Sequence, residues 1–462
     1  MYRGRIQRIH FIGIGGAGMN GIAEVLINMG YKVSGSDLAS TDVTRRLGGL
    51  GAVIYAGHGK GNVTGAQCVV YSSAVKKDNP EMIEASARQI PVIPRAEMLA
   101  ELMRLKYGIA IAGTHGKTTT TSMVSAILAS AGMDPTIVTG GKLNSLGANA
   151  RLGTGDFLVA EADESDGSFL KLNPTIAVVT NIDREHMDYW ATMDDVRQAY
   201  LDFINKVPFY GCAVLCLDHP GIQGLIPAIT RRFLSYGLTA QSDTNARRIR
   251  FDGMKTSFEV WQNRGALGEI TLNLPGEHNV YNALAALSVG RELEIDFALI
   301  KAGLESFTGV ERRFHVRGVV NGITVVDDYG HHPEEIKAAL RAAKLGFGGL
   351  RVVVVFQPHR YTRTKDLFKE FCSAFNDADK LILTEVYAAG EEKLEGATGE
   401  ALYEGIRAYG HKDASYVPDA SALAGHLSKV CSPDDLVITL GAGDVWKAGV
   451  GLLELLKGDS KA

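Results

Sequence analysis

One segment of eight residues constrains the fold of this chain more than any other. It runs from Gly113 to Thr120 with the sequence Gly-Thr-His-Gly-Lys-Thr-Thr-Thr, after the apolar stretch Ile109–Ala112 and before apolar residues at helical spacing. A strand, a tight glycine-containing turn and a helix in this order form an anion site, because backbone N–H groups and the positive end of the helix dipole face one point. The segment therefore predicts a phosphate-binding loop in an α/β domain.

The residue types in this loop match the chemistry of a nucleotide triphosphate. Lys117 would bring a cation to the outer phosphates, and Thr118 a hydroxyl to Mg²⁺. Five positions before Gly116 the usual glycine is replaced by Ile111, so the loop is a short form that begins at Gly113. A glycine-rich turn without a ligand is the alternative interpretation. We predict an ATP site formed by this run: Gly113, Thr114, His115, Gly116, Lys117, Thr118 and Thr119.

Composition narrows the class of protein. The 462 residues are 46% hydrophobic and 22% charged, which fits about three globular domains. A net charge of −4 argues against a nucleic-acid binder, and five scattered cysteines indicate a reducing compartment. The N-terminal apolar run breaks into glycines, so it predicts a strand and not a signal peptide. No apolar stretch has the length of a membrane span, and we expect a cytoplasmic protein.

Residues 1–106 carry the pattern of a small doubly wound domain. A buried strand ends in Gly13-x-Gly15-x-x-Gly18, and a second strand ends at Ser36-Asp37, about twenty positions later. A third apolar run, Cys68–Tyr71, ends in Ser72 and Ser73. The glycine loop predicts a diphosphate-binding site but does not indicate which ligand carries the diphosphate. A nicotinamide cofactor and an empty structural turn both remain open at this point.

Residues 107–309 place acidic and amide groups after two further strands. The run Glu161-Ala162-Asp163-Glu164-Ser165-Asp166 follows Phe157–Ala160 and indicates a Mg²⁺ site, with a solvated acidic turn as the alternative. The strand Ile176–Thr180 leads into Asn181 and then His186, for which the residues alone favour a capping or core role. Asn279 and Asn282 open an alanine-rich helix, where they would face one ligand unless Asn279 only caps the helix.

Residues 310–462 repeat this arrangement with basic groups. Three expected strands end in Asp327-Asp328-Tyr329-Gly330-His331-His332, in Gln357-Pro358-His359-Arg360-Tyr361-Thr362-Arg363 and in Gly441-Ala442-Gly443-Asp444. Polar residues at strand carboxyl ends are typical of ligand sites in open α/β sheets. Arg360 and Arg363 have the fork geometry that grips a carboxylate or phosphate, although surface salt bridges are the alternative.

Taken together, these motifs resemble the Mur ligase family, ATP-dependent enzymes that build the peptide stem of peptidoglycan. The resemblance covers the whole chain in order, and it is carried by the phosphate loop, the acidic run, Thr180-Asn181-Ile182 with His186, Asn279 with Asn282, and Gly441–Asp444. It implies an α/β fold of three domains. These are an N-terminal Rossmann-like domain for the UDP-sugar (1–106), a central P-loop ATPase-like parallel sheet for ATP (107–309) and a C-terminal Rossmann-like domain for the amino acid (310–462).

The resemblance also implies roles for single residues. UDP-N-acetylmuramate in place of NAD would bind Gly15, Gly16, Ala17, Gly18, Met19, Ser36, Asp37, Ser72 and Ser73. Thr118, Glu161 and His186 would hold Mg²⁺, although imidazole is an unusual ligand for this hard cation. Asn181, Asn279 and Asn282 would serve ATP, with Asn279 at the adenine. Arg360, Arg363 and His331 would hold L-alanine, and Lys117, Glu161, His186 and His331 would form the catalytic set.

The implied reaction is the ATP-dependent joining of L-alanine to the lactyl carboxylate of UDP-N-acetylmuramate through an acyl phosphate. Later-acting siblings carry a carbamoylated lysine after the metal histidine, whereas residues 187–205 here contain no lysine. A recycling ligase that adds a preformed peptide to the same sugar nucleotide is the nearest alternative. A nicotinamide-dependent oxidoreductase and a non-enzymatic nucleotide switch are more distant ones. We expect small-molecule partners, no nucleic acid or membrane, and a monomer or weak homodimer.

Overall fold

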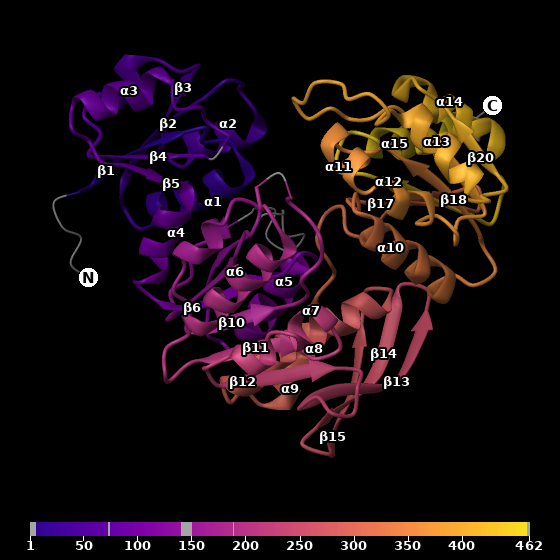
Figure 1. The fold of residues 1–462 in the computed structure, drawn as a ribbon, viewed down its shortest axis with the longest axis horizontal. Helices are drawn as coiled ribbons and strands as arrows, with labels where there is room; N and C mark the ends of the chain where they lie inside the picture. Colours follow the sequence, from indigo (N-terminus) through magenta and orange to yellow (C-terminus); the bar gives the residue numbers. More distant parts are fainter. Residues whose placement is uncertain (1–5, 73, 140–149, 188, 460–462) are drawn as a thin grey trace. The chain divides into compact units, whose positions relative to one another are not determined.

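The computed structural model describes residues 6–72, 74–139, 150–187 and 189–459. The chain divides into two compact units. Figure 1 labels the helices and strands that they contain. The first comprises Met1–Arg247, Glu259–Ile270 and Tyr281–Thr308, and the second comprises Arg248–Phe258, Thr271–Val280 and Gly309–Ala462. Within the described ranges, no helix combines the length and apolar character needed to cross a bilayer.

The N-terminal part of the first unit is a parallel five-stranded sheet of order β3-β2-β1-β4-β5. Strand β4 is a continuous apolar run, and β1 is buried from Ile9 to Ile12, as expected for parallel strands covered on both faces. Successive crossovers change direction between β1 and β4, the place where doubly wound sheets bind ligands. The elements are β1 (Arg8–Ile12), α1 (Ala17–Asn28), β2 (Lys32–Asp37), α2 (Asp42–Gly49), β3 (Val53–Ala56), η1 (Lys60–Val63), β4 (Cys68–Tyr71), α3 (Pro80–Ala87), β5 (Val92–Pro94) and α4 (Arg95–Met103).

The second sheet has the order β15-β14-β13-β12-β11-β10-β6-β9-β7-β8. Its strands are β6 (Tyr107–Ala112), β7 (Thr136–Val138), β8 (Ala150–Arg151), β9 (Phe157–Glu161), β10 (Ile176–Val179), β11 (Cys212–Cys216), β12 (Phe233–Gly237), β13 (Thr244–Asp252), β14 (Lys255–Gln262) and β15 (Gly265–Leu272). Strand β6 pairs in parallel with β9 on one side and β10 on the other. Three carboxyl ends therefore meet at one edge.

The helical elements that follow these strands are α5 (Lys117–Ser130), η2 (Ser168–Lys171), α6 (Met193–Asn205), α7 (Pro220–Gln223), η3 (Ile226–Ala228), α8 (Glu277–Glu292) and α9 (Phe297–Ser306). Helix α6 shows why such segments begin where they do. The Thr192 hydroxyl accepts the Asp195 N–H at 3.2 Å, and the Asp195 carboxylate accepts the Thr192 N–H at 2.9 Å. This reciprocal capping box satisfies donors that the first helical turn leaves open.

The second unit contains a six-stranded sheet of order β16-β17-β21-β18-β19-β20, parallel except for β16. Its strands are β16 (His315–Val320), β17 (Ile323–Asp328), β18 (Arg351–Phe356), β19 (Lys380–Leu383), β20 (Ala414–Tyr416) and β21 (Asp435–Leu440). Its helical elements are α10 (Pro333–Gly346), α11 (Tyr361–Asp366), α12 (Phe368–Cys372), α13 (Gly399–Ala408), η4 (Ala420–Ala422), α14 (Leu423–Val430) and α15 (Trp446–Asp459). The valine run of β18 lies in the core, with Val352 to Phe356 fully buried.

The predicted fold class is confirmed. Each expected domain has its own mostly parallel sheet, and the strands predicted from apolar runs are present at those positions. The limits at residues 106/107 and 309/310 stay predictions. The extension β13–β15 lies within the central segment, where no motif had indicated it.

Candidate active site

The phosphate loop connects β6 to α5, as predicted. Gly113 (φ 134°) and Gly116 (φ 83°) both adopt backbone conformations that favour glycine. Space is limited as well, because a Cβ at Gly113 would collide with the Thr180 hydroxyl and one at Gly116 would come within 2.5 Å of Asn282 Oδ1. Both glycines are thus required by conformation and by close approach.

Lys117 lies at the start of α5 and is surrounded by oxygens. Its Nζ donates to the carbonyls of Gly113 (2.6 Å) and Thr114 (3.2 Å) and to both carboxylate oxygens of Glu164 (2.8 Å each). Burial opposes the charge on Lys117, but the Glu164 and Asp163 carboxylates outweigh it and raise its pKa. Burial, only partly offset by Lys117, raises the pKa of Glu164 to about 7. A buried cation is thus held where phosphate oxygens would bind.

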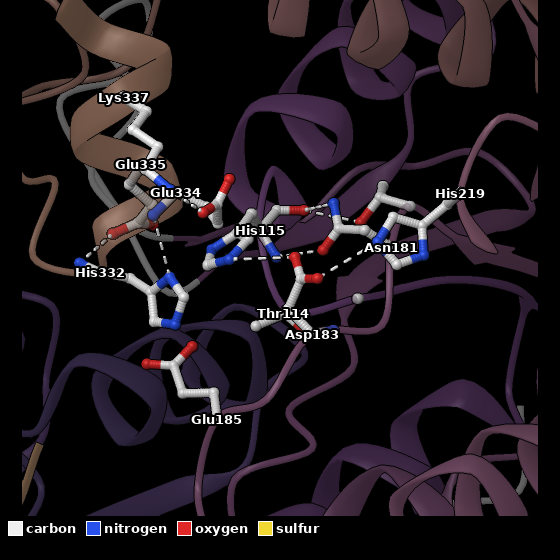
Figure 2. A network of polar contacts seen from close by, with 12 residues as sticks. Thr114, His115, Asn181, Asp183, Glu185, His219, His332, Glu334, Glu335 and Lys337 are labelled. Atoms are coloured by element: carbon white, nitrogen blue, oxygen red, sulfur yellow. Dashed lines mark hydrogen bonds and ion pairs between the residues drawn. The ribbon is translucent and has the colours of Figure 1, made fainter. Parts of the chain in front are cut away.

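Residues at the end of β10 hold the phosphate loop through hydrogen bonds (Figure 2). The side-chain oxygen of Asn181 accepts the His115 N–H at 2.7 Å, and the side-chain amide nitrogen of Asn181 donates to the His115 carbonyl at 3.0 Å. Thr180 donates to the same carbonyl at 2.6 Å. His115 and His219 flank Asp183, with Nε2–carboxylate distances of 3.4 and 3.3 Å. Asn181 therefore shapes the phosphate loop, and its direct contact with ATP stays a prediction.

The acidic run follows β9 at the same sheet edge. Glu161 ends the strand, and the Glu164 side chain is 5% exposed beside His186, whose Nε2 lies 3.9 Å from Glu164 Oε1. His186 itself has φ 56°, a conformation that costs energy for a residue other than glycine. Among the described residues no three His, Cys, Asp or Glu side chains form a preformed metal cage. Glu161 and Thr118 nevertheless supply the hard oxygen donors that Mg²⁺ prefers.

Asn279 and Asn282 lie in the first turns of α8. The Asn282 Oδ1 atom accepts from the Thr120 hydroxyl at 3.2 Å and faces Gly116, so this residue borders the phosphate loop. The Asn279 amide donates to the Pro275 carbonyl at 2.8 Å. Because Asn279 is the third residue of α8 and uses its amide as a donor, it is not the helix N-cap.

The N-terminal glycine loop is held by hydrogen bonds to the end of β2. The N–H groups of Gly13 and Ile14 donate to the Ser36 carbonyl at 2.9 and 3.1 Å, and the Gly15 N–H donates to Asp37 Oδ2 at 2.9 Å. Gly16 precedes α1, in which Ala17, Gly18 and Met19 form the first turn. The loop and the end of β2 thus form one structure, and substrate contacts by these residues stay predictions.

The Ser36 hydroxyl is directed into the protein. It donates to Glu81 Oε2 at 2.6 Å and lies 2.9 Å from His58 Nδ1. Glu81 is fully buried and also accepts from His10, Asn62 and the Gly59 N–H. At the next strand end, the Ala74 N–H lies 3.4 Å from the Ser72 hydroxyl. Ser73 lies outside the described residues.

In the second unit, the end of β17 is tied to basic side chains. Asp327 accepts from Arg312 Nε at 3.2 Å and from Arg317 Nη2 at 2.8 Å. Asp328 accepts the N–H groups of Phe314 and Gly330, each at 2.7 Å, and burial raises its pKa. These contacts orient the loop that carries His331.

Four basic residues, His331, His359, Arg360 and Arg363, come together at the ends of β17 and β18. The rings of His331 and His359 are 5.9 Å apart, and Arg363 Nη1 lies 3.3 Å from His359 Nδ1. Arg360 precedes α11 with φ 69°; its side chain is 42% exposed, and its Nε lies 4.0 Å from Glu391 Oε1. Burial, followed by the charges of His331 and the arginines, lowers the pKa of His359 to about 3. This positive potential suits a carboxylate ligand.

Helix α10 begins directly after this loop, and Figure 2 shows its first turn. The His332 ring accepts the Glu334 N–H at 3.3 Å, the Glu335 carboxylate accepts the His332 N–H at 3.3 Å, and Lys337 pairs with Glu334 at 2.7 Å. The helix start therefore holds the backbone next to His331.

Sequence reasoning missed four residues that the structure places at these sites. Glu164 is the partner of Lys117, His359 is the centre of the basic cluster, and Glu81 and His58 support Ser36. Glu164 and His359 lie within motifs that the sequence analysis identified, so their place in these motifs indicated a role at the site. Glu81 had none, because a single glutamate in an amphipathic helix is normally solvated.

Comparison with known proteins agrees with this geometry. Three family models match the chain: "Mur ligase family, catalytic domain" at residues 8–107, "Mur ligase middle domain" at 111–290 and "Mur ligase, glutamate ligase domain" at 312–443. A UDP-N-acetylmuramate–L-alanine ligase of Geobacter sp. (strain M21) is 60% identical over 98% of both chains. The crystal structure of the Thermotoga maritima UDP-N-acetylmuramate–alanine ligase MurC has a TM-score of 0.82 at 29% identity, covering 98% of this chain and 99% of that one. A murein peptide ligase from Psychrobacter arcticus 273-4 shares the fold, with a TM-score of 0.69 at 23% identity and coverage of 97% and 98%.

Proposed function

This chain belongs to the Mur ligase family, and we propose that it joins L-alanine to the lactyl carboxylate of UDP-N-acetylmuramate at the expense of ATP. The products are UDP-N-acetylmuramoyl-L-alanine, ADP and phosphate, a step of peptidoglycan precursor synthesis. The observation that carries the choice of L-alanine is the end-to-end similarity to the Geobacter L-alanine ligase. The match of residues 8–107 to a Mur ligase domain speaks against a nicotinamide cofactor at the first glycine loop.

The first step overcomes the poor reactivity of a carboxylate, whose leaving group would be oxide. A muramoyl carboxylate oxygen attacks the γ-phosphorus of ATP, the bond to the β,γ-bridging oxygen breaks, and an acyl phosphate and ADP form. Catalysis of this transfer consists of positioning and charge neutralisation. Lys117 and the positive end of the α5 helix dipole supply the positive potential that binds the phosphates.

Mg²⁺ fits the oxygen donors of the same sheet edge. Thr118 and Glu161 would hold it, with His186 as the softer ligand that family resemblance adds. When bound, the ion would neutralise phosphate charge and screen the carboxylates of the acidic run. Without it, Glu161, Asp163 and Glu164 repel the incoming phosphates, so the cation also adapts this edge to an anionic ligand.

The second step needs a free amine beside the acyl carbon. Arg360 and Arg363 grip the alanine carboxylate, and His359, whose pKa is lowered to about 3, stays neutral beside them. The amine lone pair attacks the acyl carbon, the bond to the phosphate oxygen breaks, and phosphate leaves. His331 is our candidate for receiving the proton that the amine loses.

A panel of amines tests the proposal and separates it from the recycling ligase. The purified enzyme is given ATP, Mg²⁺ and UDP-N-acetylmuramate with L-alanine, L-serine, glycine or a muropeptide-type tripeptide, and the products are identified by mass. We expect the highest kcat/KM with L-alanine. Preference for the tripeptide would establish the recycling reaction, and phosphate release indifferent to any amine would favour a nucleotide switch. We expect a monomer or weak homodimer to be sufficient for activity.

A further inference from the structure

One arginine that the mechanism does not use lies between the two glycine loops of the first unit. Arg95 is the first residue of α4, and its guanidinium packs against Gly18, where an added Cβ would lie 2.8 Å from Nη1 and 3.1 Å from Cζ. Its Nη2 atom is 3.4 Å from Asp163 Oδ2 in the acidic run. A single side chain thus contacts the predicted sugar-nucleotide loop and the predicted ATP site.

The position of Arg95 at the start of α4 is electrostatically unfavourable, which indicates that its contacts serve a function. A cation at a helix N-terminus is disfavoured by the helix dipole, and ordering a long side chain costs conformational entropy. The Arg95 side chain is nevertheless only 19% exposed. Asp163 lies within electrostatic reach of both Lys117 and Arg95, so the carboxylate links the phosphate-loop lysine to the arginine. The connected series is Gly18, Arg95, Asp163 and Lys117.

We propose that Arg95 is a positioning residue that couples binding at the two nucleotide sites. The inference rests on the proposed function, in which UDP-N-acetylmuramate binds at Gly15–Met19 and ATP at Gly113–Thr119. When ATP phosphates bind Lys117, they weaken the attraction between Lys117 and Asp163. The Asp163 carboxylate then interacts more strongly with Arg95. Arg95 is then held against Gly18 in the arrangement that the sugar nucleotide requires. Because coupling free energies are reciprocal, each ligand tightens the other.

Isothermal titration calorimetry measures this coupling directly. UDP-N-acetylmuramate is titrated into the enzyme with and without a non-hydrolysable ATP analogue and Mg²⁺. We expect the analogue to tighten wild-type binding by about fivefold or more, the low end of typical couplings. Arg95→Ala and Asp163→Asn should each reduce the effect to less than about twofold, and the double variant should add nothing further. Arg95→Lys, which keeps the charge but loses the fork, should retain part of it.

A second ion pair, between α4 and the element η2 that follows the acidic run, provides the matched control. Lys171 Nζ lies 3.3 Å from Glu97 Oε2, and these side chains are 47% and 43% exposed. Glu97→Gln removes this pair and should leave the coupling unchanged. Loss of coupling in Glu97→Gln would mean that any change in α4 has this effect, and it would overturn the inference.

Two further outcomes are distinguishable. A wild-type enzyme that binds both ligands and makes product without coupling, or an Arg95→Ala variant with wild-type coupling, overturns the role of Arg95 alone. A wild-type enzyme that binds no UDP-N-acetylmuramate overturns the proposed function and this inference with it.

Discussion

Lys117 is the residue on which carboxylate activation depends most directly. It is buried among two backbone carbonyls and the Glu164 carboxylate, so its charge is fixed in place before ATP binds. Lys117→Ala should lower kcat by about 10²–10³, the order observed when one preorganised charge-stabilising group is lost. Phosphate release under saturating substrates measures this. The exposed-pair variant Lys301→Ala is the control, and turnover near wild type in Lys117→Ala would refute the assignment.

Arg360 tests the amino-acid site in the same way. A hydrogen bond between charged groups contributes about 1.5–3 kcal/mol, so Arg360→Ala should raise the KM for L-alanine by roughly 10- to 100-fold. The KM for ATP should change far less, because ATP is assigned to residues of the phosphate loop. Initial rates with each substrate varied in turn give both constants. Equal increases in the two KM values would count against a carboxylate clamp.

Glu81 makes a prediction about pH that is independent of the reaction. Burial opposes its charge, but hydrogen bonds from His10, Ser36, Asn62 and Gly59 outweigh burial and lower its pKa from 4.5 to about 2. A depressed folded-state pKa stabilises the fold fully above pH 4.5, and this contribution is lost as the pH falls toward 2.

Urea denaturation between pH 6 and pH 3 measures this dependence. The free energy of unfolding should fall more steeply below about pH 4.5 in the wild type than in Glu81→Gln, which carries no titrating carboxyl there. Glu84→Gln, on the same helix but in a surface pair with Arg88, should behave like the wild type. Parallel curves for all three proteins would contradict the pKa assignment.

At the scale of elements, helix α5 offers a matched pair of glycines. Gly116 precedes it with φ 83° and faces Asn282, whereas Gly132 follows it with φ 72° and has open space around the position of a Cβ. Alanine at either site incurs the conformational cost of about 1–2 kcal/mol. Only Gly116→Ala displaces Asn282, so only this variant should raise the KM for ATP. Thermal unfolding and ATP kinetics separate the two effects, and a raised KM in Gly132→Ala would refute the explanation.

The elements were predictable to the extent that their causes are local. An apolar run, a glycine turn and a helical pattern lie within about twenty residues in each motif, so the strand–loop–helix units around Gly13 and Gly113 follow from the residues. The interaction partners of individual side chains do not follow from the local sequence. Glu164 is 47 residues from Lys117, and Asp163 is 68 residues from Arg95. Such pairs depend on which strands become neighbours, and here β9 lies beside β6 although β7 and β8 separate them in sequence.

At the scale of the whole molecule, strand order converts separate motifs into sites. The order β10-β6-β9 gathers Asn181, Lys117 and Glu161, and the order β17-β21-β18 gathers His331 and Arg363. Burial, together with the charges of several segments, lowers the pKa of His359, so no single motif predicted it. The role of Arg360 and Arg363 as a pair came from resemblance, and the basic cluster supplies a physical reason for it.

The residues assigned to the sugar nucleotide and to the ATP phosphates all lie in the first unit, whereas those assigned to L-alanine lie in the second. Activation of the carboxylate should therefore proceed without the amino acid. Reversible formation of an acyl phosphate would let the β-phosphate of bound ADP rotate before ATP is re-formed.

Positional isotope exchange tests this claim most directly. ATP labelled with ¹⁸O in the β,γ-bridging position is incubated with the enzyme and Mg²⁺, with and without UDP-N-acetylmuramate and in the absence of L-alanine. We predict that the label moves to the non-bridging β positions only when UDP-N-acetylmuramate is present, and that Lys117→Ala suppresses the movement. Exchange that is independent of the sugar nucleotide, or no exchange while ligation proceeds at the wild-type rate, would contradict activation of the carboxylate at the phosphate loop.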